Sequence, residues 1–184
     1  MREFSDSELI AKTREGDNEA YGVLVKRYID PLYAFVFRMS GEKDDAEDIV
    51  QEAFVKAWKK LGHFDIRRSF KPWLYTIARN AFLDSIKSKK GIPFSSFDTE
   101  EGNYIEDTAV HEAPGAGEMF DQELASRDLR SLIATLNGAY QIVIALHLEE
   151  GLTFAQISEI LGEPIDTVKS RYRRACTKLK ALIV

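Results

Sequence analysis

Apolar and polar positions follow a helical period over much of the chain, most clearly in residues 44–62. The apolar positions in this stretch are separated by three and by one residue in turn. They are Ala46, Ile49, Val50, Ala53, Phe54, Ala57, Trp58 and Leu61. This spacing places them along one side of a helix. The stretch therefore predicts an amphipathic helix that buries this side and leaves the opposite, polar side in solvent.

A helix over residues 17–40 is expected before this one, and a third long helix from about residue 69 to residue 90 is expected after it. Their ends are predicted from residue types that favour caps, first turns and stops. These are Asp17 or Asn18 as the first N-cap, Pro31 as a kink, Gly41 as a stop, Ser69 as the second N-cap and Pro72 in the first turn of its helix.

The helical period disappears between Gly91 and Gly117, where Gly, Ser, Pro and acidic residues are frequent. Such a composition is typical of a flexible linker. Helical patterning resumes near Glu118 and continues to the end of the chain. Because strand patterns are almost absent, we expect an all-α protein with two small helical domains, 1–90 and 118–184, joined by a linker over 91–117.

The last forty residues contain the pattern of a helix-turn-helix. Thr153 and Gln156 have the spacing of a capping box, and Gly162 is placed to end the short helix that follows. After a turn, Asp166 is expected to cap a second helix. Two short helices joined by a tight turn that contains glycine are typical of this motif.

The second helix has two different sides when it is read at ~100° per residue. The side expected to face the core holds Val168, Tyr172, Ala175, Leu179 and Leu182. The opposite side holds Ser170, Arg173, Arg174 and Thr177, with Lys169, Arg171 and Lys178 on the flanks. In DNA-binding proteins such an outward side enters the major groove and the flanks meet phosphates. The alternative interpretation is a solvated basic side on an ordinary helical pair.

Charge is unevenly distributed along the 184 residues, whose formal net charge is −5. Residues 1–90 hold 17 basic and 15 acidic groups, residues 91–130 hold 2 and 10, and residues 131–184 hold 6 and 5. The acidity thus belongs to the middle of the chain, and from Thr167 onward there are six Lys or Arg and no carboxylate side chain. This asymmetry indicates segments with different partners.

Several classes of protein are disfavoured by what the sequence lacks. The single cysteine, Cys176, leaves no internal disulfide and fits a reducing cytosol, so we expect a cytoplasmic protein. No apolar run approaches the ~20 residues that cross a bilayer, and the charged N-terminus does not resemble a signal peptide. His63, His111 and His147 are isolated, and no catalytic, zinc or phosphate-binding motif is found. We therefore expect no enzyme activity, metal or cofactor.

Two separate stretches resemble the extracytoplasmic-function (ECF) sigma factors of bacterial RNA polymerase. "LTFAQISEILGEPIDTVKSRYRRACTKL" resembles the promoter-reading domain of that family. "DDAEDIVQEAFVKAWKKLGHFD" and "FKPWLYTIARNAFLDSIKSKK" resemble its core domain. The resemblance implies a factor that binds core RNA polymerase, reads a −35 element as duplex, captures unpaired bases of the −10 element, and is held inactive by an anti-sigma factor.

The resemblance also assigns residues to each contact. Polymerase binding falls on the polar side of the 44–62 helix, at Asp48, Gln51, Glu52 and Val55. Downstream-element binding falls on Phe64, Arg67, Arg68, Arg79, Asn80 and Lys87. Upstream-element binding falls on Lys169, Ser170, Arg171, Arg173, Arg174 and Lys178. The alternatives are a solvated helix side for the first group and, for the aromatic and loop residues of the second, structural roles.

The sequence departs from the family pattern at two places. Asp166 stands where members often carry glycine, and it serves either as an N-cap or as an acceptor for a cytosine amino group. "LNGAY" replaces the more usual Leu-Pro start of the preceding helix.

One alternative function is a helix-turn-helix regulator that binds its site without polymerase, and another is a helical adaptor or enzyme. The first leaves residues 1–90 unexplained, and the second lacks a catalytic constellation.

Overall fold

The computed structural model describes residues 4–90 and 129–183, and within these ranges it contains helices and no strand. In the N-terminal half the elements are α1 (Asp6–Arg14), α2 (Asn18–Ser40), α3 (Lys43–Lys60), the 3-10 helix η1 (Leu61–His63) and α4 (Phe70–Lys90). The C-terminal half holds α6 (Leu129–Ala134), α7 (Gly138–Ile144), the π-helix η3 (Ala145–Glu149), α8 (Phe154–Leu161) and α9 (Ile165–Ile183). The all-α prediction is confirmed, whereas the expected linker and the helical start near Glu118 lie outside the described residues.

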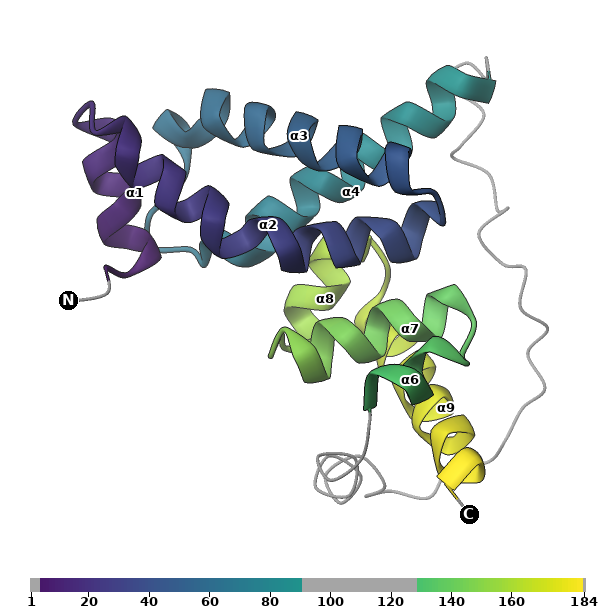
Figure 1. Ribbon diagram of the computed structural model, residues 1–184. Helices are drawn as coiled ribbons and strands as arrows, with labels where there is room; N and C mark the ends of the chain where they lie inside the picture. Colours follow the sequence, from purple (N-terminus) through teal and green to yellow (C-terminus); the bar gives the residue numbers. More distant parts are fainter. Residues whose placement is uncertain (1–3, 91–128, 184) are drawn as a thin grey trace.

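Helices α2, α3 and α4 pack side by side in the N-terminal half (Figure 1). The ends of α2 are those that the sequence predicts: the Asp17 side chain accepts a hydrogen bond from the Ala20 amide at 3.2 Å, and Gly41 follows the helix with φ 72°. Only a residue without a Cβ adopts this left-handed backbone at little cost, which explains the glycine. The helix runs through Pro31.

The apolar stripe of α3 is buried as expected except at Trp58. The other members of the stripe are at most 7% exposed, but the Trp58 side chain is 41% exposed. Its ring meets the ring of Tyr21 edge-on at 4.8 Å, and the Tyr21 hydroxyl donates a 2.6 Å hydrogen bond to the Phe54 carbonyl. Trp58 lies at the rim of the stripe, so the prediction that it is a core residue is wrong.

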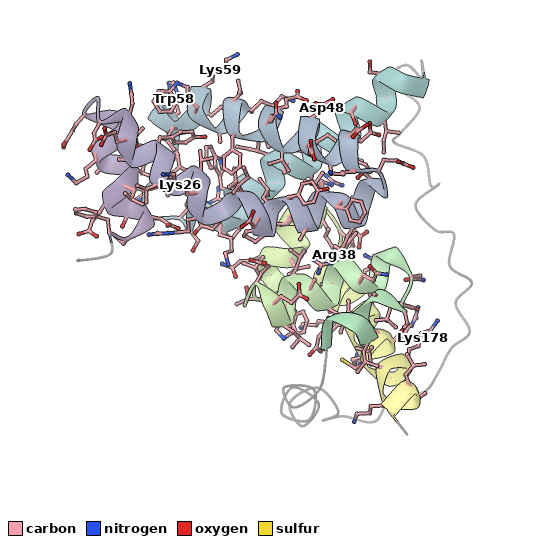
Figure 2. All side chains as sticks on the ribbon, viewed as in Figure 1. Lys26, Arg38, Asp48, Trp58, Lys59 and Lys178 are labelled. Carbon is pink, nitrogen blue, oxygen red and sulfur yellow. The ribbon has the colours of Figure 1, made fainter. Side chains whose placement is uncertain are left out.

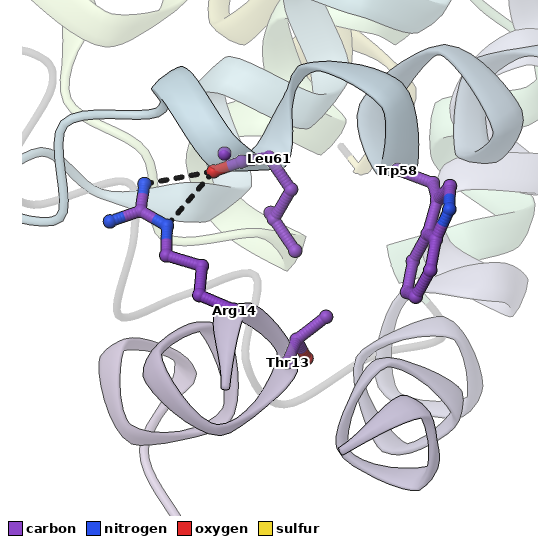
Figure 3. Close-up of a pocket in the computed structure, with 5 residues that line it drawn as sticks. Thr13, Arg14, Trp58 and Leu61 are labelled. Carbon is purple, nitrogen blue, oxygen red and sulfur yellow. Dashed lines mark hydrogen bonds between the residues drawn. The ribbon is translucent and has the colours of Figure 1, made fainter. Parts of the chain in front are cut away.

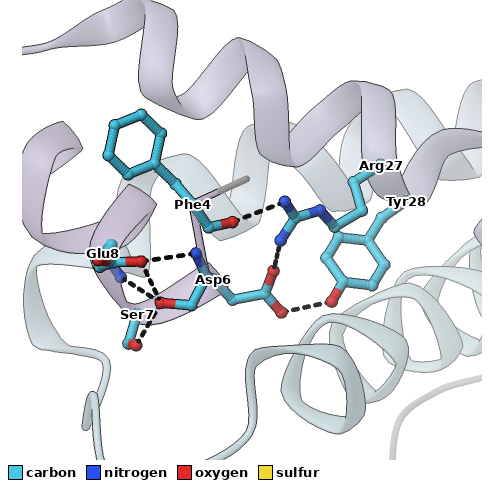
Figure 4. A network of polar contacts seen from close by, with 7 residues as sticks. Phe4, Asp6, Ser7, Glu8, Arg27 and Tyr28 are labelled. Carbon is cyan, nitrogen blue, oxygen red and sulfur yellow. Dashed lines mark hydrogen bonds and ion pairs between the residues drawn. The ribbon is translucent and has the colours of Figure 1, made fainter. Parts of the chain in front are cut away.

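Helix α1 was not anticipated, although a capping box marks its start. Ser5 accepts from the Glu8 amide, and the Glu8 carboxylate accepts from the Ser5 amide at 2.8 Å. Figure 4 shows how Asp6 then joins α1 to α2: its carboxylate accepts from the Arg27 guanidinium and from the Tyr28 hydroxyl. This connection fixes α1 against the helices that carry the candidate sites.

The helix-turn-helix is present in the C-terminal half. Thr153 and Gln156 form the expected capping box, and Gly162 ends α8 with φ 64°. Two details differ from expectation. Helix α9 begins at Ile165, so Asp166 lies in its first turn and is not the N-cap. Leu182 is 53% exposed, because it lies in the last turn of α9, beyond the helices that cover Leu179.

A cluster of aromatic rings joins the π-helix to the helix-turn-helix. The His147 ring stacks on Phe154 at 4.4 Å and meets Tyr172 edge-on at 4.8 Å. His147 Nδ1 also lies 2.8 Å from the Leu152 carbonyl. This histidine therefore has a structural role that fixes α8 and α9 relative to the preceding turn.

The two halves pack against each other, a feature that the sequence analysis did not predict. Helix α8 contacts α4, and α7 contacts α2 (Figure 1). The buried residues of both halves form one continuous apolar cluster. The helix-turn-helix thus lies against the helix that carries several candidate downstream-element residues.

Candidate polymerase and nucleic-acid interfaces

The polar side of α3 is open to solvent. Asp48, Gln51, Glu52 and Val55 are all exposed, and Figure 2 shows Asp48 on the side of α3 turned away from the C-terminal half. The Val55 side chain is 52% exposed, which gives this surface an apolar centre among polar groups. We call these four residues the α3 face. Its position matches the sequence prediction.

One residue of the α3 face is held by a charge network. Lys56 lies 2.8 Å from the Glu52 carboxylate and 3.4 Å from that of Asp84 on α4. The hydrogen bond to Glu52 is the main cause of a raised pKa for Lys56. Glu52 therefore belongs both to the α3 face and to the contact between α3 and α4, so Asp48 is the cleaner probe of binding.

A small pocket beside Trp58 was missed in the sequence reasoning (Figure 3). It has a volume of about 360 Å³ and is lined by Thr13, Arg14, Trp58, Leu61 and Gly62. The Arg14 guanidinium donates to the Leu61 carbonyl at 3.1 and 2.8 Å and also to the Phe64 carbonyl, so it links α1 to both ends of η1. The signal in the sequence was the place of Trp58 at the edge of the apolar stripe.

The loop between η1 and α4 differs from the expected base-capturing loop at its first residue. Phe64 is 5% exposed and packs on Trp73 and Phe70, with ring centroids 4.6 and 5.9 Å away. Its ring is therefore unavailable for stacking on a base in this conformation. Ile66, which the sequence analysis did not single out, is the exposed apolar residue of this loop, at 39%.

Arg67 and Arg68 are exposed in the same loop, and both have acidic partners. The Asp65 carboxylate accepts from the amide and the guanidinium of Arg67, and this hydrogen bonding lowers the pKa of Asp65 to about 2. Arg68 forms an ion pair with Glu159 of α8. Arg67 thus orders its own loop, whereas Arg68 reaches into the C-terminal half.

The downstream candidates on α4 lie in different surroundings. Asn80 is exposed and Lys87 is half-buried. Arg79 is also half-buried and lies under the turn of the helix-turn-helix, where a Cβ on Gly162 would be 3.2 Å from its guanidinium nitrogens. Burial lowers the pKa of Arg79, and the negative charge of Glu163 opposes that change.

Helix α9 presents its basic residues on the side opposite its buried stripe. Val168, Tyr172, Ala175 and Leu179 are at most 3% exposed, as expected. Lys169, Arg173 and Lys178 are exposed, and Ser170, Arg171 and Arg174 are half-buried.

Arg171 and Lys178 have partners within the C-terminal half. Arg171 forms an ion pair with Glu163 at 2.6 Å, and the Lys178 ammonium lies 5.0 Å above the Tyr140 ring. Arg171 therefore fixes the turn before α9 in addition to any role at DNA.

The described residues contain no group of three or more His, Cys, Asp or Glu placed to hold a metal ion. Among the same residues, no helix is long and apolar enough to span a bilayer. Cys176 is a buried free thiol.

Comparison with protein families gives two matches in the expected order. Residues 24–92 match Sigma-70 region 2, and residues 126–179 match Sigma-70 region 4. The first range contains α3 and α4, and the second contains α8 and most of α9.

Individual relatives extend the likeness over nearly the whole chain. The ECF RNA polymerase sigma factor SigW of Bacillus subtilis is 34% identical over 93% of this chain and 92% of that protein. The ECF RNA polymerase sigma-E factor of Escherichia coli K12 is 30% identical over 94% of this chain and 91% of that protein.

Solved structures give the same result. CnrH, solved in complex with the cytosolic domain of CnrY, superposes with a TM-score of 0.61 at 26% identity and covers 97% of this chain and 96% of CnrH. RpoE of Bartonella quintana, solved with the anti-sigma factor NepR, gives 0.59 at 28% identity over 89% and 96% of the two chains. Both motifs, their order and these full-length likenesses agree, and the chain belongs to the ECF family of RNA polymerase sigma factors.

Proposed function

We propose that this chain binds core RNA polymerase through the α3 face and directs it to promoters, reading the upstream element with α9 and the downstream element with α4 and the loop before it. The observation that carries this proposal is the presence of two distinct surfaces in one chain. One is an exposed, partly acidic helix side centred on Val55, and the other is a basic recognition helix. A regulator that acts alone needs only the second.

Helix α9 is suited to duplex DNA because its cations stand opposite a fully buried stripe. Arg173 and Arg174 lie on the side that enters the major groove, where a guanidinium binds guanine through two hydrogen bonds. Lys169 and Lys178 lie on its flanks, where an ammonium neutralises phosphate charge without reading sequence. The upstream element is therefore read by the arginines and anchored by the lysines.

The downstream element falls to the exposed part of the 64–69 loop and to α4. Unpaired bases stack on exposed apolar or guanidinium surfaces. Ile66 and Arg68 offer such surfaces, and Asn80 offers an amide for base edges. Phe64 is assigned to the core beneath this loop and not to base stacking.

The α3 face combines the carboxylates of Asp48 and Glu52 with the apolar side chain of Val55. A buried apolar centre with a charged rim is the usual composition of a protein interface. We assign core polymerase to this face. The chain itself acts as an initiation factor and not as an enzyme.

A protein inhibitor is also part of this proposal. The solved relatives CnrH and RpoE are each bound to another protein, and the partner of RpoE is an anti-sigma factor. We propose that this chain is likewise controlled by an anti-sigma protein.

Run-off transcription with purified core polymerase on a library of genomic fragments tests the proposal. We expect discrete transcripts that appear only when this chain and core polymerase are both present. DNA binding by the chain alone, with no transcripts when core polymerase is added, would instead establish the helix-turn-helix regulator.

A further inference from the structure

Helix α2 leaves apolar side chains open to solvent along its outer side. Three of the large apolar side chains that remain exposed belong to this helix: Val23 at 44%, Ile29 at 43% and Phe37 at 42%. At ~100° per residue, Val23 and Phe37 lie on the side of α2 opposite the buried Tyr28 and Phe35. Exposed apolar side chains that gather on one side of a helix mark a candidate interface.

The outer side of α2 has the spacing of a coiled-coil contact. Its central residues follow one another at intervals of four and three, so they keep the heptad period over about 27 Å of helix. Five of these six residues are exposed, and Tyr33 is half-buried, with its ring stacked on that of Phe37 at 6.1 Å. We call the six residues the α2 row. They are Glu19, Val23, Lys26, Asp30, Tyr33 and Phe37.

The centre of the α2 row carries two opposite charges. Lys26 and Asp30 are exposed, and among the described residues neither forms an ion pair within the chain. A charge at the contact position of a coiled coil costs stability unless the partner helix supplies the opposite charge, so it selects the partner and its direction. The α2 row therefore fits a helix that presents an acid opposite Lys26 and a base opposite Asp30.

A second copy of α2 that runs antiparallel supplies both charges. With the two-fold axis level with Tyr28, each residue lies opposite the residue that is equally far beyond Tyr28 on the other helix. Lys26 then faces Asp30 of the second copy, and Asp30 faces its Lys26. The same register sets Val23 against the Tyr33 ring of the second copy, again twice. The α2 row is thus self-complementary, as an interface between two identical chains requires.

The residues beside the α2 row fit the same arrangement. Ile29 lies next to the axis, so it meets Ile29 of the second copy. On the other flank Arg27 approaches its own copy, but the Asp6 carboxylate of the same chain already offsets its charge. Gly22 has no atom within 4 Å of the place that a Cβ would take, which leaves room for the second helix on the Ile29 side.

We propose that the α2 row is a dimerisation surface on which two copies of this chain pair as antiparallel helices. The α2 row is separate from the α3 face, and the proposal does not depend on the sigma-factor function. One pair of helices buries less surface than a standard protein interface, so we expect weak association, with a dissociation constant of about 10–100 µM. The chain is then monomeric in dilute solution and dimeric when it is concentrated.

Sedimentation equilibrium of the full chain over a wide range of concentrations tests this surface. Lys26→Asp and Asp30→Lys each replace the two attractive pairs of the dimer by two repulsive ones, so each variant should self-associate about tenfold more weakly. Lys59→Asp, the same charge change at an exposed position of α3, is the matched control and should associate like the unchanged chain. Both lysine variants move the formal net charge from −5 to −7, so general repulsion between copies is equal.

Mixing the two charge variants gives the sharpest comparison. The Lys26→Asp chain presents two acids and the Asp30→Lys chain presents two bases, so an equimolar mixture should form a heterodimer at least as readily as the unchanged chain forms its dimer. The double variant, with Lys26→Asp and Asp30→Lys together, should also regain the original association. Either restoration shows that the single variants are folded and that the charges meet between chains.

Three results would overturn the proposal. The first is an unchanged chain that stays monomeric at every concentration. The second is self-association of Lys26→Asp that equals that of Lys59→Asp, and the third is a mixture of the two charge variants that remains monomeric. None of these measurements involves polymerase, so transcription with core polymerase still tests the proposed function independently.

Discussion

The α3 face and the cations of α4 and of the loop before it belong to the same half of the molecule. They differ in their contacts with the other half. The four residues of the α3 face are exposed while the two halves are packed together. They are Asp48, Gln51, Glu52 and Val55. By contrast, Arg68 and Lys71 pair with glutamates of the other half, and Arg79 lies under its turn.

This difference suggests an order of events. Because the α3 face is exposed whereas Arg79 lies under the turn of the other half, we expect core polymerase to dock on the packed chain before DNA does. We expect opening to depend on polymerase holding the two halves apart.

The largest expected effect comes from the α3 face. Asp48→Lys should weaken binding to core polymerase by about 2–4 kcal/mol, because it reverses a charge in the rim of the proposed interface. Isothermal titration with core polymerase measures the loss. Glu19→Lys, an equal charge change at an exposed position of α2, is the control and should bind normally. Equal losses in both variants would show that core polymerase does not bind through the α3 face.

Helix α9 supplies the next effect. Arg174→Ala should cost about 1–3 kcal/mol of discrimination for the upstream element, the value of a two-hydrogen-bond base contact. Lys178→Ala should instead weaken binding to all sequences and reduce the salt dependence. Transcription from intact and scrambled upstream elements separates the two. An Arg174 defect of the same size on both templates would make that residue a phosphate contact.

The contact between the two halves predicts a loss of stability of similar size at Lys71. Lys71→Met leaves the Glu150 carboxylate, 15% exposed, without its cation, which should cost about 1–3 kcal/mol. Urea unfolding followed by tryptophan fluorescence and by circular dichroism should then show the two halves separating before the N-terminal half unfolds. Lys26→Met, at an exposed site on α2, should leave the transition unchanged. A single unaltered transition in Lys71→Met would show that the Lys71–Glu150 pair contributes nothing to stability.

Two buried tyrosines give the smallest effect and compare the two regions directly. Tyr21, beneath α3, donates a hydrogen bond to the Phe54 carbonyl, whereas the Tyr75 hydroxyl is buried near Glu150 and has no hydrogen bond of normal length among the described residues. Tyr21→Phe should therefore cost about 1 kcal/mol at neutral pH, and Tyr75→Phe should cost less than that. Urea titrations of both variants at pH 7 measure this. The reverse ranking would mean that the Tyr75 hydroxyl makes a hydrogen bond that this conformation lacks.

The raised pKa of Tyr21 predicts how the stability of the fold responds to alkali. Burial raises the pKa of Tyr21 from its ordinary value of 10 to about 12. The folded chain therefore keeps this proton where the unfolded chain releases it, and stability is full below pH 10 and falls as the pH rises toward 12. Tyr21→Phe should flatten this fall. An unchanged alkaline profile would place the titration elsewhere.

The sequence predicted the helices better than their association. Asp17, Gly41, Thr153 and Gly162 mark helix ends through local backbone chemistry, and the structure confirms each of them. Asp166 failed as a cap because α9 begins at Ile165, and such a shift of one or two residues is invisible to a propensity argument. Helix α1 was missed, although its capping box is of the same local kind.

The candidate sites divide in the same way. A helical angle count placed the α3 face and the buried side of α9 correctly, because exposure on a single helix follows from periodicity. Phe64 and the ion pairs between the two halves depend on which elements meet in three dimensions. No periodicity shows that Phe64 packs on Trp73, or that Glu150 reaches Lys71 seventy-nine positions away along the chain.

The most direct test of the proposed order is the distance between the two halves during assembly. Dyes are placed at Lys26→Cys on α2 and Ala181→Cys on α9, both exposed, with Cys176→Ala to remove the native thiol. We predict efficient energy transfer in the free chain and a fall on adding core polymerase before any DNA is present. An Asp48→Lys version of the same protein should show no fall. Transfer that stays unchanged with core polymerase and falls only when promoter DNA is added would contradict the account.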